Sequence, residues 1–250
     1  PLAWSSAASD VYKRQVFSVS HVSCNGFYDG NIFSNVSGGT APYQYVWANS
    51  SYALSTTSSG LTNFPADNYF LEVTDNNGCK LYDTTNIIEP TMLWDTLIGV
   101  DILCKGESTG EINSIISGGT PPYSYSWDNG ASSQNLQFLS AGNYQLQITD
   151  FNNCQLTDSI ILNEPISSLG SYYFSTDPLC YGSNDGTIDY FVTGGTSPYS
   201  YVWNNTQNIP NMINLNAGDY IVITTDANNC TLSDTCLLYT SDAADDQASV

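Results

Sequence analysis

The stretch GGTPPYSYSW, residues 118–127, decides the fold of this chain. Its last five residues alternate aromatic and serine side chains, so Tyr123, Tyr125 and Trp127 should share one face of a strand. The stretch recurs with small changes at residues 38–47 and 194–203. The three Gly-Gly pairs are 80 and 76 residues apart in the sequence. This spacing is too long for a solenoid repeat and predicts three tandem domains.

Each copy reads as a series of short strands joined by turns, and no segment has a helical pattern. In the second copy, Ile112, Ser114 and Ile116 should share one face of a strand, and residues 144–148 alternate apolar and polar side chains. Six or seven such strands with frequent turns predict an all-β fold, made of three tandem immunoglobulin-like antiparallel β-sandwich domains. We expect the tryptophans and the tyrosines of the repeated motifs to form the structural core: Trp47, Trp127, Trp203, Tyr69, Tyr144 and Tyr220.

The expected domains are residues 16–90, 91–165 and 166–235. Residues 1–15 and 236–250 match nothing in the repeats. Each of these terminal segments has two interpretations, translated read-through of non-native sequence or a linker. The chain lacks an initiator Met and a basic-then-apolar export segment at its start, so we expect a fragment of a longer protein.

Six of the seven cysteines open and close the three copies. Pairing within each copy encloses loops of about 50 residues, whose closure stabilises a small domain by about 4 kcal/mol. Pairing between adjacent cysteines of neighbouring copies leaves the first cysteine without a natural partner, so we expect one disulfide in each domain. Disulfides indicate an oxidising compartment, hence a secreted or cell-surface protein. The expected pairs are Cys24–Cys79, Cys104–Cys154 and Cys180–Cys230, and the alternative pairs are Cys79–Cys104 and Cys154–Cys180.

Charge and composition exclude several classes of function. The formal net charge is −20, with only four Lys and Arg residues. Because no basic patch can neutralise phosphates, we expect no nucleic-acid partner. No apolar run is long enough to span a bilayer. The only histidine, His21, occurs in one copy, and no nucleophile recurs together with a general base, so we expect no enzyme.

A Thr-Asp-x-Asn-x-Cys segment closes every copy. Its oxygen-bearing side chains would suit Ca²⁺, which is the one cofactor that the sequence suggests. The alternative is a purely structural role, because Asp and Asn form turns through local hydrogen bonds. The candidate calcium ligands are Asp75, Asn77, Asp150, Asn152, Asp226 and Asn228.

Four strings of the sequence, C-x-G-x-x-x-G-x-I, GGT-x-PY-x-Y-x-W, AG-x-Y and TD-x-x-x-C, resemble the SprB repeat of very large surface adhesins of gliding Bacteroidetes. Residues 104–165 and 180–234 fit best, whereas the first copy has a longer middle loop and Asp67 in place of Gly. The resemblance implies a cell-surface protein, exported by the type IX system, with a role in gliding motility or attachment. Repeats of the polycystic-kidney-disease type are the nearest alternative family.

Two functions follow from this resemblance. The first is an adhesin stalk, whose repeats act as spacers and as multivalent contacts to an extracellular surface or polysaccharide and to neighbouring repeats of the same chain. The second is a carbohydrate-binding accessory module of a secreted enzyme whose catalytic domain lies outside this chain. Loop aromatics that differ between copies are the candidate exposed contacts: Phe27, Tyr28, Tyr52, Phe151 and Tyr181.

Overall fold

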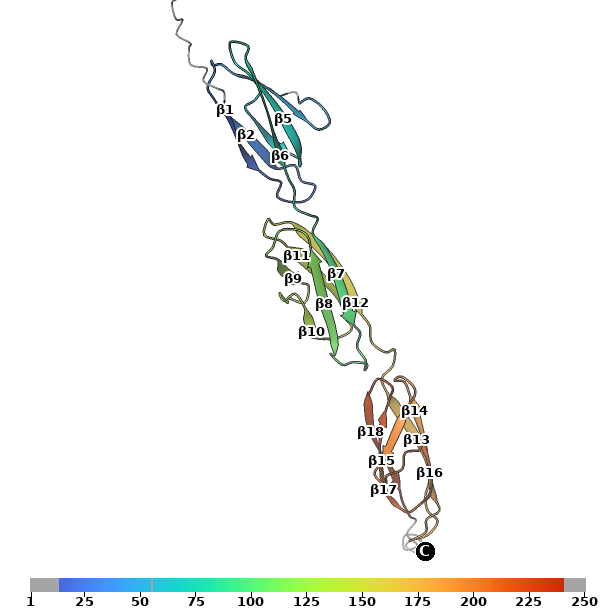
Figure 1. The fold of residues 1–250 in the computed structure, drawn as a ribbon. Helices are drawn as coiled ribbons and strands as arrows, with labels where there is room; N and C mark the ends of the chain where they lie inside the picture. Colours follow the sequence, from blue (N-terminus) through green and yellow to red (C-terminus); the bar gives the residue numbers. More distant parts are fainter. Residues whose placement is uncertain (1–13, 55, 241–250) are drawn as a thin grey trace, which may run out of the picture. The chain divides into compact units, whose positions relative to one another are not determined.

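The computed structural model describes residues 14–54 and 56–240 (Figure 1). This part of the chain contains eighteen strands and no helix, and every strand pair whose register is given is antiparallel. The predicted all-β fold with antiparallel strands is therefore confirmed. Every described strand belongs to one of six three-stranded sheets, and each copy of the repeat contributes two of these sheets.

The strand order is the same in all three copies. In the first copy, one sheet consists of β1 (Arg14–Ser20), β2 (Gly30–Ser37) and β4 (Gly60–Phe64). The other sheet consists of β3 (Gln44–Asn49), β5 (Asp67–Thr74) and β6 (Lys80–Ile87). In the second copy the sheets are β7 (Trp94–Val100), β8 (Gly110–Ser117) and β10 (Leu136–Leu139), and β9 (Ser124–Trp127), β11 (Gly142–Thr149) and β12 (Gln155–Leu162). In the third they are β13 (Gly170–Thr176), β14 (Gly186–Thr193) and β16 (Asn211–Leu215), and β15 (Ser200–Trp203), β17 (Gly218–Thr225) and β18 (Thr231–Leu238).

The chain divides into two compact units, and their boundary passes through the second copy. Among the described residues, unit 1 contains residues 14–54, 56–96, 115–132 and 146–158, and unit 2 contains residues 97–114, 133–145 and 159–240. The strand pattern recurs three times, but the compact units number two. The prediction of three separate domains is therefore not confirmed, and the domain boundaries within the chain stay predictions.

The alternation of side chains along the strands builds the core. In unit 1, Trp47 on β3 and Tyr69 and Leu71 on β5 are completely buried and pack with Ile32 of the facing sheet. In unit 2, Trp203 packs in the same way with residues of β14, β16, β17 and β18. Two sheets with one apolar face each bury those faces by packing against one another.

The expected core residues differ in their burial. Trp47, Trp127, Trp203 and Tyr69 are buried, whereas Tyr144 and Tyr220 are only partly buried. All three tyrosines donate a hydrogen bond from the hydroxyl group to the backbone carbonyl four residues earlier, at 2.8 to 3.0 Å. The ring of Tyr69 thus lies in the core and those of Tyr144 and Tyr220 lie at its edge, while each hydroxyl fixes the preceding turn.

The last strand extends beyond the expected end of the third copy. β18 pairs with β17 along its whole length, as far as Leu238 opposite Gly218. Cys236 and Leu238 point into the core and are buried. Residues 236–238 therefore continue the repeat, although their composition departs from that of the second copy; β1 likewise begins at Arg14, inside the expected N-terminal segment 1–15. The rest of both predicted terminal segments lies outside the described residues, except Tyr239 and Thr240.

Candidate functional site: the disulfide-linked repeat junctions

The opening turn of each copy follows its first strand and contains the opening cysteine. In the second copy the amide of Glu107 donates to the carbonyl of Cys104 at 3.1 Å. Gly106 has a φ of +82°, which an L-residue with a side chain rarely adopts. Its amide donates to Glu164 of the same copy at 2.7 Å, and this hydrogen bond lowers the pKa of Glu164. The first copy has the same arrangement, because Gly26 donates to Glu89.

The closing hairpin of each copy is held by its aspartate. In the second copy, Asp150 is buried and its Oδ1 accepts the amides of Asn152 and Cys154, both at 2.8 Å. Its Oδ2 accepts the amide of Thr120 at 2.8 Å. Such a turn forms because the carboxylate satisfies backbone donors that the hairpin leaves unpaired. Asp75 and Asp226 make the equivalent contacts in the other copies.

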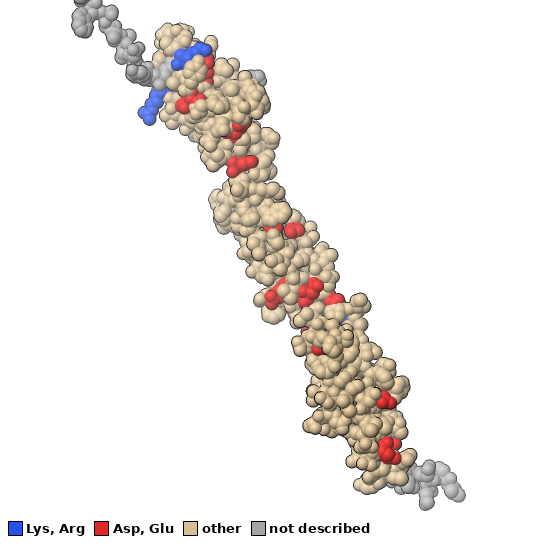
Figure 2. Space-filling view, turned by 45° about the vertical axis from the view of Figure 1, so that its right-hand side comes forward, with Lys and Arg blue, Asp and Glu red and all other residues tan. Residues whose placement is uncertain are grey.

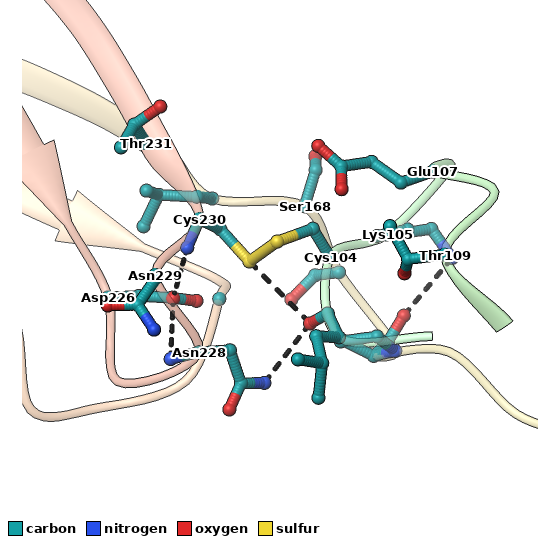
Figure 3. Close-up of a pocket in the computed structure, with 15 residues that line it drawn as sticks. Cys104, Lys105, Glu107, Thr109, Ser168, Asp226, Asn228, Asn229, Cys230 and Thr231 are labelled. Carbon is teal, nitrogen blue, oxygen red and sulfur yellow. Dashed lines mark hydrogen bonds between the residues drawn. A yellow bond between two sulfur atoms is a disulfide. The ribbon is translucent and has the colours of Figure 1, made fainter. Parts of the chain in front are cut away.

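The two disulfides join opening turns to closing hairpins of different copies. Cys24 bonds to Cys154 with a Cα–Cα distance of 5.7 Å, and both cysteines belong to unit 1. Cys104 bonds to Cys230 with a Cα–Cα distance of 5.6 Å, and both belong to unit 2 (Figure 3). In each case the opening cysteine of one copy is linked to the closing cysteine of the next copy.

An asparagine side chain reinforces each disulfide. Nδ2 of Asn152 donates to the carbonyl of Ser23 at 2.9 Å. Nδ2 of Asn228 donates to the carbonyl of Leu103 at 3.1 Å (Figure 3). The accepting carbonyl belongs in both cases to the residue before the opening cysteine. The hairpin is thus attached to the turn by one covalent bond and one hydrogen bond.

The two disulfides differ from both predicted sets of pairs. The predicted pairing within each copy is wrong, and the alternative pairing between adjacent cysteines of neighbouring copies is wrong as well. The amide of Val22 donates to the carbonyl of Ile88, which places the opening turn at the far end of β6. Cys79 directly precedes the start of this eight-residue strand. At about 3.3 Å per residue the two ends of β6 are roughly 26 Å apart, and a disulfide needs a Cα–Cα distance below about 7 Å. The wrong pairs are Cys24–Cys79, Cys104–Cys154 and Cys180–Cys230, together with Cys79–Cys104 and Cys154–Cys180.

The cysteines outside the two bonds lie in different surroundings. Cys180 is an exposed thiol in the opening turn of the third copy. Cys236 is a buried thiol, and burial raises its pKa to about 12, with a further contribution from the charge of Asp234. A thiol with such a pKa has almost no thiolate at neutral pH, so Cys236 is a core residue and not a reactive group.

The predicted calcium ligands lie together in the closing hairpins. Each pair serves the hairpin itself, because the carboxylate accepts three amides and the asparagine amide donates to a threonine hydroxyl. Within residues 14–54 and 56–240, no group of three or more His, Cys, Asp or Glu side chains is placed to hold a metal ion. Calcium binding at Asp75, Asn77, Asp150, Asn152, Asp226 and Asn228 stays a prediction, which calorimetry of the chain with CaCl₂ would test.

A polar pocket lies beside the disulfide of unit 2. Lys105, Glu107, Ser168, Asp226 and Thr231 are among the residues that line it (Figure 3). The carboxylate of Asp226 accepts three backbone amides, which hold it in the closing hairpin. The arrangement is suited to holding two chain segments together.

The surface carries the remaining candidate contacts. The loop aromatics named from the sequence are exposed, with Tyr181 at 95% and Phe27 at 54% exposure. Figure 2 shows acidic side chains in small separate groups on the face in view, with few basic ones. No helix among the described residues has the length and apolar character needed to cross a membrane.

The contacts at the junctions could not be predicted from side-chain motifs. Ser23 and Leu103 contribute backbone carbonyls, which any residue would supply. The available signal in the sequence is the recurring asparagine two residues before each closing cysteine, which indicates a calcium ligand or a turn residue. The asparagine side chain donates a hydrogen bond to another copy only where an opening turn lies opposite the hairpin, and the sequence does not show which turn that is.

Comparisons with known proteins give one family and a group of solved structures. The comparison with curated proteins found no match. Among solved structures, the eight N-terminal Ig domains of Down Syndrome Cell Adhesion Molecule are 12% identical, with a TM-score of 0.38, and the alignment covers 90% of this chain and 36% of that one. Invasin, a bacterial integrin-binding protein, is 12% identical with a TM-score of 0.32, covering 92% of this chain and 60% of that one. Dpr2 Ig1–Ig2 in complex with DIP-Theta Ig1–Ig3 is 9% identical with a TM-score of 0.31, covering 90% and 99%.

The family comparison matches the SprB repeat at residues 16–51, 96–132 and 173–208. Each matched segment begins within the first strand of a copy and runs past its tryptophan. The match therefore covers the opening turn, the Gly-Gly corner and the aromatic strand, which contain two of the four strings of the resemblance; AG-x-Y and TD-x-x-x-C lie outside the matched segments. The chain is thus similar to the SprB repeat at three places along its length.

Proposed function

We propose that this chain is part of the repeat region of a cell-surface adhesin, where the repeats serve as a stalk and as multivalent contacts. In the setting that SprB repeats imply, the parent protein is exported by the type IX system of a gliding bacterium and acts in motility or attachment. Its partners are an extracellular surface or polysaccharide and the neighbouring repeats. The chain itself has no catalytic role in this proposal.

One observation carries the proposal: each disulfide joins one SprB repeat to the next. A covalent link between successive repeats suits a protein that transmits force along its length. With both bonds intact, the shortest covalent path from Cys24 to Cys230 passes through Cys154 and Cys104 and contains only the 50 residue steps between these two. Without the bonds the same ends are separated by 206 residue steps, which is the difference between 230 and 24.

Single-molecule pulling tests the load-bearing part of the proposal. At about 3.4 Å per extended residue, the fully unfolded chain should lengthen by roughly 500 Å when the disulfides are reduced. The matched control is the Cys24→Ser/Cys104→Ser variant, whose extension should not change with reductant. An oxidised chain that extends as far as this variant would contradict the proposal that the junctions limit extension.

Adhesion is tested with the chain attached to beads at different densities. Many weak contacts predict that attachment to glass or to polysaccharide-coated surfaces under flow rises steeply with density, whereas the soluble chain binds the same surfaces weakly. Antibody labelling of intact cells that express the parent protein tests its location on the surface. Attachment proportional to density, or labelling only after permeabilisation, would contradict the adhesin function.

The alternative is a carbohydrate-binding accessory module of a secreted enzyme, and the exposed loop aromatics favour it. Aromatic side chains such as Tyr28 and Tyr181 could stack on sugar rings. A glycan array probed with the soluble chain separates the two functions. A specific micromolar glycan that is lost in the Tyr28→Ala or Tyr181→Ala variant would favour the accessory module.

A further inference from the structure

The opening turn of the third copy has the same internal structure as the two opening turns that are bonded. The amide of Ser183 donates to the carbonyl of Cys180 at 3.0 Å, as Glu107 does to Cys104 in the second copy. Gly182 has a φ of +81°, against +82° for Gly106. The turn is therefore already formed although no hairpin of this chain is bonded to it.

A second internal contact also recurs. Oδ1 of Asp185 accepts the amide of Leu179 at 3.2 Å, and Oδ1 of Asp29 accepts the amide of Ser23 at 3.0 Å in the first copy. The hydrogen bond that each aspartate accepts from a serine hydroxyl lowers its pKa, and the backbone hydrogen bond lowers it further. The residue before the opening cysteine is thus oriented in the third copy as it is in a bonded one.

The difference between the copies lies in what covers the cysteine. Cys24 is buried and Cys104 is half-buried, and both are bonded to a closing hairpin. Cys180 is exposed, and the large side chains beside it, Leu179 and Tyr181, are 77% and 95% exposed. The third turn exposes the surface that a hairpin covers in the other two.

We infer that the turn of Cys180 is a docking site for the closing hairpin of a further SprB repeat, which would bond to it through its own closing cysteine. The hairpin's asparagine would donate to the carbonyl of Leu179, as Asn152 does to Ser23 and Asn228 does to Leu103. This inference concerns assembly between repeats and does not rest on the proposed adhesin function.

The bond forms by thiol–disulfide exchange with atoms and electrons balanced. The thiolate of Cys180 attacks the hairpin sulfur of a mixed disulfide between the hairpin and glutathione. The new sulfur–sulfur bond forms as the old one breaks, and glutathione leaves as a thiolate that takes up the proton lost by Cys180. The oxidising equivalent comes from oxidised glutathione, which made the mixed disulfide.

The test measures the equilibrium of this exchange on the full chain. The probe is a backbone-cyclised peptide of residues 145–160, which contains Cys154 as its only thiol, in a glutathione buffer. We expect mass spectrometry to locate the peptide on Cys180. The equilibrium constant should be about fivefold larger than for the Asn152→Ala peptide, because one hydrogen bond is lost in that variant.

Two controls make the result specific to this site. The Cys180→Ser chain should take up no peptide, and N-acetylcysteine gives the equilibrium constant of a thiol without hairpin contacts. Equal constants for the two peptides would overturn the inference, as would a hairpin constant no larger than that of N-acetylcysteine. Peptide found on another cysteine of the chain in preference to Cys180 would overturn it too.

Discussion

The second and third repeats have the same strand order, and one informative difference between them lies on their first strands. In the third, Ser171 on β13 donates its hydroxyl hydrogen to Asp234 on β18 at 2.7 Å. The equivalent position in the second repeat, 76 residues earlier, is Asp95 on β7, and the equivalent of Asp234 is Asp158 on β12. Asp95 is buried, and neither of its carboxylate oxygens has a hydrogen-bond partner among the described residues.

This difference shows what one side chain does at equivalent positions of two repeats with the same strand order. Burial raises the pKa of Asp95 to about 6, and the charge of Asp158 contributes to the rise. A serine at that position supplies a donor to the neighbouring carboxylate, whereas an aspartate supplies a second negative charge. The second repeat should therefore be sensitive to pH where the third is not.

The largest expected change in the free energy of unfolding comes from replacing the opening cysteine of the second repeat, and the same replacement in the third repeat should have almost no effect. Cys104→Ser removes a bond between residues 126 positions apart and should lower the free energy of unfolding by about 4 kcal/mol under oxidising conditions. Cys180→Ser removes an exposed thiol and should change it by less than about 0.5 kcal/mol. Urea unfolding followed by tryptophan fluorescence measures both values, and the difference should vanish in dithiothreitol. A persistent difference in dithiothreitol would mean that the bond is not its cause.

The next effect should be equal in the two repeats. Asp150→Ala and Asp226→Ala each leave three backbone amides without their acceptor, at a cost of about 3 kcal/mol. The isosteric Asp150→Asn and Asp226→Asn variants keep one acceptor oxygen and should lose less stability. The same urea unfolding measures all four variants. A loss in one repeat only would show that the two hairpins are held by different contacts.

Much of this fold could be predicted because its signals are local. The alternation at residues 123–127 and 144–148 is a property of each strand alone, and both segments lie mostly in β9 and β11. The aspartate and asparagine of each closing hairpin were identified, with a turn as one of their two interpretations. The composition of the sequence does not predict the continuation of β18 to Leu238, because it changes at Cys236. Cys236 and Leu238 nevertheless keep the alternation of inward-facing side chains.

The connections between distant segments could not be predicted in the same way. The disulfide partners depend on which end of β6 or β12 each cysteine occupies, and sequence spacing does not contain that information. The second repeat's acid pair was missed for a similar reason, because Asp95 and Asp158 are 63 positions apart and belong to different strands. Charge interactions of this kind appear only once the strands are placed.

The pH effect of this pair should be smaller than that of either hairpin variant. Asp95 in the folded chain has a pKa above its unfolded value of about 3.9, so the folded state binds more protons between that value and about 6. Its contribution to stability is therefore fully present below about pH 4 and is lost as the pH rises through 6. Asp95→Ser should raise the free energy of unfolding by about 2 kcal/mol at pH 7.5 and by much less at pH 4.

The reverse change in the third repeat provides the matched control. Ser171→Asp places a second carboxylate beside Asp234 and should introduce the pH dependence that Asp95→Ser removes. Chemical unfolding at pH 4, 6 and 7.5 gives both profiles. If Asp95→Ser and the parent chain had parallel pH profiles, the acid pair would not be the source of the difference between the repeats.

The smallest expected effect concerns the Gly-Gly corners, where the two repeats agree. The hydroxyl of Tyr123 donates to the carbonyl of Gly118 at 2.6 Å, and that of Tyr199 donates to Gly194 at 2.7 Å. Tyr123→Phe and Tyr199→Phe should each cost about 1 kcal/mol, because the ring keeps its packing and only one hydrogen bond is lost. Tyr181→Phe, at a 95% exposed position, should not measurably change the free energy of unfolding and serves as the control in the same urea unfolding.

Since the glycines that accept these bonds have φ values of +71° and +63°, the tyrosine holds a backbone bend that only glycine adopts readily. Unequal losses would mean that the repeats differ at their corners as well as at the acid pair.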